Sequence, residues 1–330
     1  MDFGLGKREI LLLSALFANG DGETGYSVKD AALKMGVSSA VVSRVAAGLM
    51  RKGFIESRRD GKCRRITLSK ALHAQALREL AAANPHVRLE EILANSAIRV
   101  LAGLIPDNPR SATEIAGSTS TPMVTVRRVL ARLAARGIIS RKDAEYSLVL
   151  PRLREFEQDY AAYAVDSKRK GLLGSLIVAG QHGLLRTAML PREGMVLTGI
   201  SVLHKYGVKL IEIDARDYYF NAFDDSPEAP ALEEAIVHCL LRAAMLASGR
   251  EAAYAMLAVY KNWKKLDRER FAELAADFSV SSAAGQCLKL VDMFVKGERW
   301  PEPMTNGYRI SEGPLWPSWE GFGGLVTQYE

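Results

Sequence analysis

Apolar residues recur at helical spacing in two neighbouring segments near the start of the chain. The longer segment, 39–52, carries an apolar stripe at positions i, i+3, i+4 and i+7: Val42, Val45, Ala46 and Leu49. This spacing predicts an amphipathic helix with one buried face. A shorter helix is predicted over 27–35, because Ser27 is a favoured N-cap and Asp30 follows at the third position. Residues 36–38 interrupt the pattern, so a tight turn joins the two helices.

The pattern becomes strand-like after Gly53, which ends the longer helix. Residues 54–59 and 63–68 are predicted to be strands, and Asp60-Gly61 is a strong signal for a two-residue hairpin turn between them. Two helices joined by a turn and followed by a hairpin form the winged helix-turn-helix, in which the second helix enters the major groove of DNA. The pattern therefore predicts such a module near the start of the chain.

The same order of elements returns 84 residues later, with residues 27–56 and 111–140 matching without a gap. Ser111 is the expected cap of the second copy's first helix. The apolar stripe also returns, as Val126, Val129, Leu130 and Leu133. A helix rich in Ile and Leu is predicted before each copy, at 10–17 and 92–104. A repeat of this length indicates a duplicated structural unit.

The rest of the chain is predicted to be α/β and then helical. Connecting helices are expected over 70–84 and 153–165, and short strands over 184–190 and 209–213. Four helices are predicted to follow, over 230–247, 251–261, 267–278 and 282–295. The expected fold class is mainly α with small β wings, an α+β architecture. In chain order, the expected domains are a first winged helix-turn-helix, a helical linker, a second winged helix-turn-helix and a C-terminal sensing, oligomerisation or partner-binding domain: 1–72, 73–87, 88–150 and 151–330.

Charge is distributed unevenly along the 330 residues. Residues 1–150 contain 23 Lys and Arg against 14 Asp and Glu, whereas the remainder contains 21 against 24. A basic half joined to a mildly acidic half favours contact between the first half and a polyanion. We therefore expect residues 1–150 to bind duplex DNA without the remainder of the chain.

The polar faces of the two modules carry residues suited to double-stranded DNA. Small, hydroxyl-bearing and basic side chains on a helix suit the major groove, and a basic hairpin suits the backbone or the minor groove. The candidate DNA-binding residues of the first copy are Ser39, Ser43, Arg44, Arg51, Arg58, Arg59, Lys62, Arg64 and Arg65. Those of the second copy are Thr125, Arg127, Arg128 and Arg132. The second hairpin balances two bases with two acids, so the first hairpin is expected to bind DNA more strongly.

The first module resembles the MarR-type winged-helix transcription regulators. The segments Val41-Val42-Ser43-Arg44-Val45, 49–56 and 60–69 look like that family's recognition helix and wing. The resemblance covers about residues 5–70, and 90–150 more loosely. It implies DNA binding and a response to ligands or partners. The chain departs from the family in having two modules and no obvious pair of long dimerisation helices. A winged helix can also serve as a protein-binding module whose basic residues are only solvated.

A second resemblance concerns the C-terminal half. The segments 198–208 and 266–275 are similar to the C-terminal domain of abortive-infection antitoxins of the AbiE type, over roughly residues 170–295. That resemblance implies a protein that represses its own operon and counters a nucleotidyltransferase toxin. The alternative is that Gly199 and Gly207 simply bracket a packed helix.

Motifs for enzymatic chemistry are weak in this sequence. The GxGxxG match at 20–25 follows a predicted helix and contains two acids, so it is interpreted as a loop and not as a dinucleotide site. Glu212 and Asp214 share one face of a predicted strand, as in some metal-dependent nucleases, but the lysine that such sites use is missing. The five histidines and three cysteines show no zinc-binding spacing. We expect no catalytic residue, no metal and no cofactor.

The leading hypothesis is a cytoplasmic, sequence-specific regulator that binds double-stranded DNA as a monomer or a homodimer. The alternative is an autoregulating antitoxin that binds a toxin or another protein through residues 151–330. A metal-dependent nuclease is the third hypothesis, and it depends on Glu212 and Asp214 alone. No apolar stretch reaches the roughly 18 residues of a membrane helix. The tryptophan-rich tail from Gly297 is expected to form an irregular strap packed on the domain surface.

Overall fold

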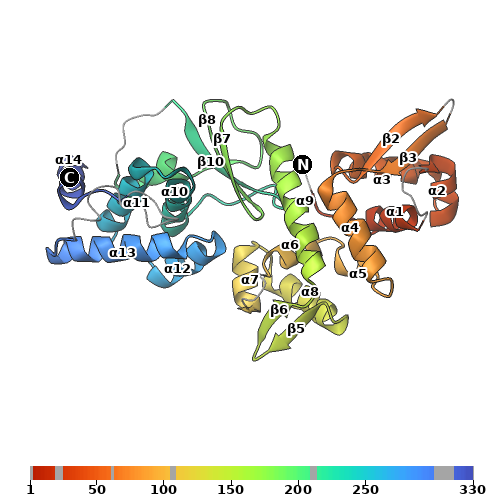
Figure 1. Ribbon diagram of the computed structural model, residues 1–330, viewed down its shortest axis with the longest axis horizontal. Helices are drawn as coiled ribbons and strands as arrows, with labels where there is room; N and C mark the ends of the chain where they lie inside the picture. The colour runs from red at the N-terminus through yellow and green to blue at the C-terminus, as the bar shows by residue number, and fades with distance from the viewer. Residues whose placement is uncertain are drawn as a thin grey trace. The chain divides into compact units, whose positions relative to one another are not determined.

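The structure is a computed structural model that describes residues 3–18, 25–60, 63–104, 109–208, 214–300 and 316–329. The chain divides into two compact units, unit 1 (Met1–Lys168) and unit 2 (Arg169–Glu330). Unit 1 is coloured from red to yellow-green in Figure 1, and unit 2 from green to blue. Helices predominate, and the described sheets are small and antiparallel, which confirms the mainly helical α+β class.

Unit 1 contains two copies of one arrangement of elements (Figure 1). The first copy consists of α1 (Lys7–Phe17), β1 (Tyr26–Ser27), α2 (Val28–Met35), α3 (Ser39–Arg51), β2 (Ile55–Asp60) and β3 (Cys63–Leu68). The second copy contains β4 (Arg110–Ser111), α7 (Ala112–Ser118), α8 (Met123–Ala135), β5 (Ile139–Lys142) and β6 (Glu145–Leu148). Helices α3 and α8 begin and end 84 residues apart, and the strand orders correspond, as β1-β3-β2 and β4-β6-β5. The repeat in the sequence is therefore a repeat in the structure.

The two copies start their helices with the caps that the sequence predicts. Ser27 Oγ accepts a hydrogen bond from the Asp30 amide at 3.1 Å, and Ser111 Oγ accepts one from the Glu114 amide at 3.2 Å. These bonds satisfy amides that would otherwise lack a partner in the first helical turn. All four residues of the α8 stripe are buried, and in α3 only Val45 of the predicted stripe is half-buried.

Each copy ends in a hairpin that extends beyond its own helices (Figure 1). In the first hairpin Asp60 pairs with Cys63, so residues 61–62 connect the strands in place of the expected Asp60-Gly61 turn. Those two residues, Lys62 among them, lie outside the described part of the chain. In the second hairpin Asp143 and Ala144 have φ of 49° and 68°. Positive φ at both positions is what a tight type I′ turn requires.

The helix expected over 92–104 is interrupted. The chain forms α5 (Leu89–Ile92) and α6 (Ala97–Ala102), with Asn95 at φ 60° between them. The Asn95 amide donates to Leu5 O at 2.7 Å, and Leu5 pairs with Ala94 in an isolated parallel bridge. The helix is interrupted because this segment is hydrogen-bonded through its backbone to the start of the first copy. The local sequence pattern gives no sign of this long-range contact.

Helix α9 (Pro151–Arg169) packs on the first copy. The Tyr160 hydroxyl donates to Phe3 O at 2.6 Å, and the Tyr160 ring lies 4.9 Å from that of Phe54. At Gly53, where φ is +74°, an added Cβ would lie 2.3 Å from Tyr163 Cζ. Glycine is thus needed there both for the backbone conformation and for the approach of α9.

The unit boundary therefore differs from the domain start expected at residue 151. It falls after Lys168, because the buried face of α9 completes the core of unit 1. The segment expected as a linker contains α4 (Leu72–Ala83), whose residues His73, Ala74, Leu77 and Leu80 are buried. This helix also belongs to the core of unit 1.

Unit 2 combines one sheet with a group of helices. Its sheet has the order β7-β8-β10-β9, with β7 (Ser175–Ala179), β8 (His182–Thr187), β9 (Val196–Leu197) and β10 (Arg216–Asn221). Its helices are the 3₁₀ helix η1 (Gly199–Tyr206), α10 (Leu232–Leu246), α11 (Gly249–Lys261), α12 (Arg268–Asp277), α13 (Ser281–Lys296) and α14 (Trp319–Tyr329). Helices α10 to α13 confirm the four predicted helices, with ends shifted by one or two residues.

The tail of the chain is more regular than expected. Residues 319–329 form α14, although an irregular strap was predicted. Trp300 and Trp316 are 3% and 4% exposed, so these tryptophans are buried as expected. The strand predicted over 209–213 and the tail residues 301–315 lie outside the described residues.

Candidate nucleic-acid interface

The face of α3 opposite its buried stripe is exposed and basic. The residues along the middle of this face are spaced as successive helical turns: Ala40, Arg44, Ala47 and Arg51. Ser39 is exposed in the first turn, and Ser43 is half-buried at the side of the face. Alanines beside the arginines leave space for another surface to approach closely. We call Ala40, Arg44, Ala47 and Arg51 the outer stripe of α3.

Helices α2 and α3 meet at an angle suited to groove binding. The chain bends by 106° between them, within the range of about 90–120° typical of helix-turn-helix units. Neither α3 nor its counterpart α8 has an acidic residue in its first turn. The positive end of the helix dipole is therefore free of a neutralising side chain there, which favours the approach of an anion.

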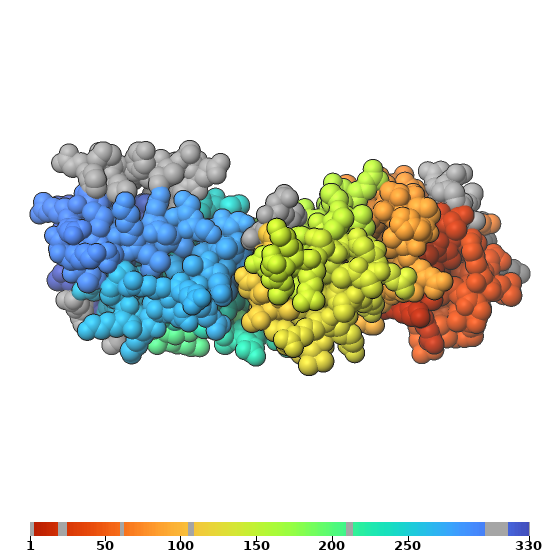
Figure 2. Space-filling view, turned by 90° about the horizontal axis from the view of Figure 1, so that it is seen from below, coloured from red at the N-terminus to blue at the C-terminus, as the bar shows by residue number. Residues whose placement is uncertain are grey.

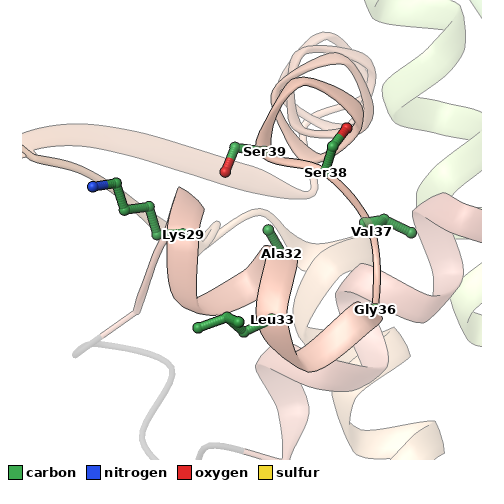
Figure 3. A pocket seen from close by; sticks show the side chains of 7 residues that line it. All are labelled: Lys29, Ala32, Leu33, Gly36, Val37, Ser38 and Ser39. Carbon is green, nitrogen blue, oxygen red and sulfur yellow. The ribbon is translucent and has the colours of Figure 1, made fainter.

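A groove lies at the turn between α2 and α3. It has a volume of about 600 Å³ and is lined by Lys29, Ala32, Leu33, Gly36, Val37, Ser38 and Ser39. Figure 3 shows Lys29 and Leu33 on α2, with Ser38 and Ser39 where α3 begins. The groove is thus lined by a lysine of α2 and by the two serines at which α3 begins. Leu33, 82% exposed, gives it one apolar wall.

The first hairpin carries four exposed arginines in two directly opposed pairs. Arg58 faces Arg65 across the strands, and Arg59 faces Arg64. Successive pairs project to opposite faces of the hairpin. Arg64 Nε donates to Ser57 Oγ at 2.6 Å, which orients this guanidinium along the hairpin. Like charges directly opposite each other destabilise a hairpin, so a polyanion that neutralises them would bind favourably.

In the second copy, α8 offers a similar face, but its outer stripe holds one arginine and that of α3 holds two. Its outer stripe, at the positions equivalent to that of α3, is Val124, Arg128, Ala131 and Ala135, all of them exposed. Arg127 is exposed at one side of this stripe, and Thr125 is half-buried. Val124 is 79% exposed and was not among the residues chosen from the sequence. Its spacing of four residues from Arg128 could have identified it.

Arg132 differs from the other candidates on α8. It is half-buried, and its Nε is buried without a hydrogen-bond partner. Its equivalent in α3 is Gly48, which is buried against Glu9 of α1. The repeat therefore places Arg132 toward the interior side of its helix, away from the outer stripe.

The second hairpin carries as many acids as bases at its tip. The Arg141 guanidinium lies 5.7 Å from the centre of the Tyr146 ring, and Lys142 is directly opposite Glu145. The carboxylates of Asp143 and Glu145 offset the charges of Arg141 and Lys142, so the hairpin as a whole has less positive charge to offer to DNA. The two hairpins thus differ in the way that the sequence predicts.

Unit 2 contains a buried group of charges beside its sheet. Arg186 donates to both carboxylate oxygens of Asp217, at 2.7 and 2.8 Å, and to Glu251 at 2.5 Å. Arg242 lies 3.6 Å from Asp217, and burial lowers the pKa of Arg242. Two cations balance two anions here, as buried charges require. The cluster is therefore explained as a structural feature of unit 2.

The segment 198–208 of unit 2 is organised around a second polar contact. Thr198 Oγ1 lies 2.6 Å from His238 Nδ1, and burial lowers the pKa of His238 to about 3. Gly199 and Gly207 flank η1 with φ of 52° and 84°. These glycines bracket a packed helix, which is the structural alternative to the antitoxin resemblance.

Among the described residues, no three His, Cys, Asp or Glu side chains are grouped closely enough to hold a metal ion. Glu212 lies outside those residues, and Asp214 is exposed. Within the same ranges, no single helix has the length and apolar character needed to cross a membrane.

The chain was also compared with known proteins. No protein-family model matches it, and no curated protein sequence matches it.

Proposed function

We propose that unit 1 binds double-stranded DNA through two winged helices and that the protein is a sequence-specific transcription regulator. The observation that carries this proposal is the basic surface of the first copy, which consists of the outer stripe of α3 and the opposed arginine pairs of the β2–β3 hairpin. The two elements are in contact, since the Arg64 guanidinium donates to Met50 Sδ of α3 at 3.5 Å. Within the described residues, Arg44, Arg51, Arg58 and Arg59 form no ion pair. Their charges are therefore available to phosphates.

The geometry supports separate roles for the helix and the hairpin. Arg44 lies in the second turn of α3, and in helix-turn-helix docking the N-terminal part of the second helix contacts base edges. An arginine there can form two hydrogen bonds to one guanine. Lys29 and Ser39, at the groove beside the start of α3, suit a phosphate of the backbone. The hairpin arginines suit the backbone or the minor groove.

The second copy is proposed to read a different sequence. Arg128 corresponds to Arg44, but Val124 and Arg127 stand where α3 has Ala40 and Ser43. An exposed apolar side chain can contact the methyl group of thymine, and Val124 is larger than the alanine at the equivalent position of α3. Because the two helices present different side chains, a monomer would bind an asymmetric operator. A homodimer would bind a long inverted repeat.

The test is selection of source-genome DNA fragments by the full chain, followed by affinity measurements at several salt concentrations. The logarithm of affinity should fall linearly with the logarithm of salt concentration, by a slope of about −0.9 for each phosphate neutralised. Replacing the four hairpin arginines by alanine should reduce that slope. Arg8→Ala, an exposed change on α1, is the matched control. Failure to retain any fragment, or an affinity independent of salt, would contradict the proposal.

A further inference from the structure

A polar cavity of about 470 Å³ lies inside unit 1, between the first copy and the segment that leads into the second copy. Small-molecule sites typically have volumes of about 300–1,000 Å³, so the cavity is large enough for a metabolite. Three parts of the chain form its wall, namely the start of the first copy, the end of α3 and the segment entering α6. The lining residues are Gly4, Leu5, Gly6, Glu9, Lys52, Asn95, Ser96 and Arg99.

One side of the cavity is a fixed ion pair. Lys52 Nζ lies 2.7 Å from Glu9 Oε2 and donates to Gly4 O at 2.5 Å, while the Gly6 amide donates to the same Glu9 oxygen at 2.8 Å. Only 11% and 13% of the Lys52 and Glu9 side chains are exposed. The carboxylate neutralises the ammonium group, which keeps one of its three N–H donors for the cavity.

Another part of the lining carries a positive charge that no acid among the described residues balances. Within the described residues the Arg99 side chain makes no hydrogen bond or ion pair. The Ser96 side chain does not cap α6, so its hydroxyl is available. Asn95, held at φ 60° by its backbone bond to Leu5, adds an amide. The lining therefore combines several donors with one excess positive charge, a combination that suits a phosphate or carboxylate group.

We propose that this cavity binds a small metabolite bearing a phosphate or carboxylate group, and that its occupancy alters the DNA affinity of unit 1. The second part rests on the proposed function. Glu9 and Lys52 belong to the first copy, whereas Asn95 and Arg99 lie on the segment leading into the second. An anion held between Lys52 and Arg99 would restrict the spacing of the copies. A ligand that favours one spacing shifts the population toward it, and DNA affinity changes accordingly.

The binding test uses calorimetry on the full chain at constant ionic strength, with inorganic phosphate and succinate as probes. Arg99→Ala should weaken binding by about tenfold or more, since it removes charge-assisted hydrogen bonds. Asn95→Asp should also weaken binding, because the added carboxylate repels an anionic probe. Aspartate, like asparagine, tolerates the positive φ of this position. Arg152→Ala, an exposed change on α9, should leave binding unchanged. Tighter binding of phosphate or of succinate identifies which group the cavity takes.

Two results would overturn the site: no binding of either probe, or equal binding to the wild-type and Arg99→Ala chains with unfolding midpoints that match. The regulatory part is tested by measuring DNA affinity with and without saturating probe. The wild-type affinity should change at least about threefold, and that of Arg99→Ala should not. An equal response of both chains would refute regulation through the cavity. If the chain binds no DNA, the proposed function fails, while the calorimetric result on the cavity can still be interpreted.

Discussion

Arg44, Arg132 and Arg141 share a residue type but not an environment. Arg44 is exposed on the outer stripe of α3, Arg132 has its Nε buried, and Arg141 lies over the ring of Tyr146. A guanidinium reaches DNA only if it is exposed and not already engaged. Among these three residues, Arg44 alone meets both conditions.

Arg44 is expected to recognise a base. Replacing it by alanine should weaken binding to a selected operator by about 1–3 kcal/mol more than binding to a scrambled duplex, because a bidentate contact with guanine is lost. Titration of both duplexes with the Arg44→Ala and wild-type chains measures this difference. Equal losses on the two duplexes would show that Arg44 only holds a phosphate.

His73 makes the stability of unit 1 depend on pH. Burial lowers its pKa from 6.5 to about 4, although its Nε2 lies 3.0 Å from Lys52 O. Between pH 6.5 and 4 the unfolded chain therefore binds more protons than the folded chain. The free energy of unfolding should fall as the pH falls through this range, by up to about 1.4 kcal/mol per pH unit.

The pH effect can be assigned by comparing urea unfolding of the wild-type and His73→Gln chains at pH 7.5 and pH 5. Glutamine keeps a polar group that can reach the Lys52 carbonyl, but it does not titrate. The variant should lose less stability than the wild type on acidification. His182, whose pKa burial lowers to about 4, remains in both chains and contributes equally. An identical pH dependence would show that His73 is not responsible.

At the scale of elements, the two hairpins have the same topology and different electrostatics. Each pairs its strands antiparallel and joins them to a short third strand, β1 or β4. The strands of the first hairpin have six residues and those of the second have four. The longer hairpin carries four exposed arginines, whereas the shorter one carries as many acids as bases at its tip. The duplication therefore preserved the fold and changed the surface.

The hairpins should contribute unequally to DNA binding. Changing Arg58, Arg59, Arg64 and Arg65 to alanine should weaken binding to all sequences and reduce the salt dependence by roughly one unit of slope for each lost phosphate contact. The double change Arg141→Ala with Lys142→Ala should have a much smaller effect. Binding curves at two salt concentrations test both. Equal losses from the two sets would show that the second hairpin binds DNA as strongly as the first.

At the scale of the whole molecule, α9 decides where unit 1 ends. Phe156 and Tyr160 are fully buried in unit 1, against Phe54 of the first copy. An aromatic side chain of this kind buries roughly 150–250 Å². A fragment that stops at residue 150 would leave the facing aromatic surface in water.

Residues 1–168 should therefore fold and bind DNA, whereas residues 1–150 should be markedly less stable. Far-UV circular dichroism during heating should show a cooperative unfolding transition for the longer fragment. The shorter fragment should unfold at a lower midpoint temperature or show no cooperative transition. DNA binding by the longer fragment at the affinity of the full chain would locate the interface within unit 1. Equal midpoints for the two fragments would contradict the role given to α9.

The sequence by itself determined the features that depend on neighbouring residues. Caps at Ser27 and Ser111, the stripes of α3 and α8, and the order of helices α10 to α13 follow from propensities and periodicities within about a dozen residues. The duplication, the arginines of the first hairpin and the equal numbers of acids and bases in the second were also predictable, because they are features of the local sequence.

Only the tertiary structure decided the features that depend on distant contacts. The break at Asn95 needs the carbonyl of Leu5, and the place of α9 in unit 1 needs a bond between Tyr160 and Phe3, which are 157 positions apart. The inward position of Arg132 and the unbalanced charge of Arg99 likewise depend on how helices pack. No local pattern records these contacts, since they form only when segments remote in the chain bury their apolar faces together.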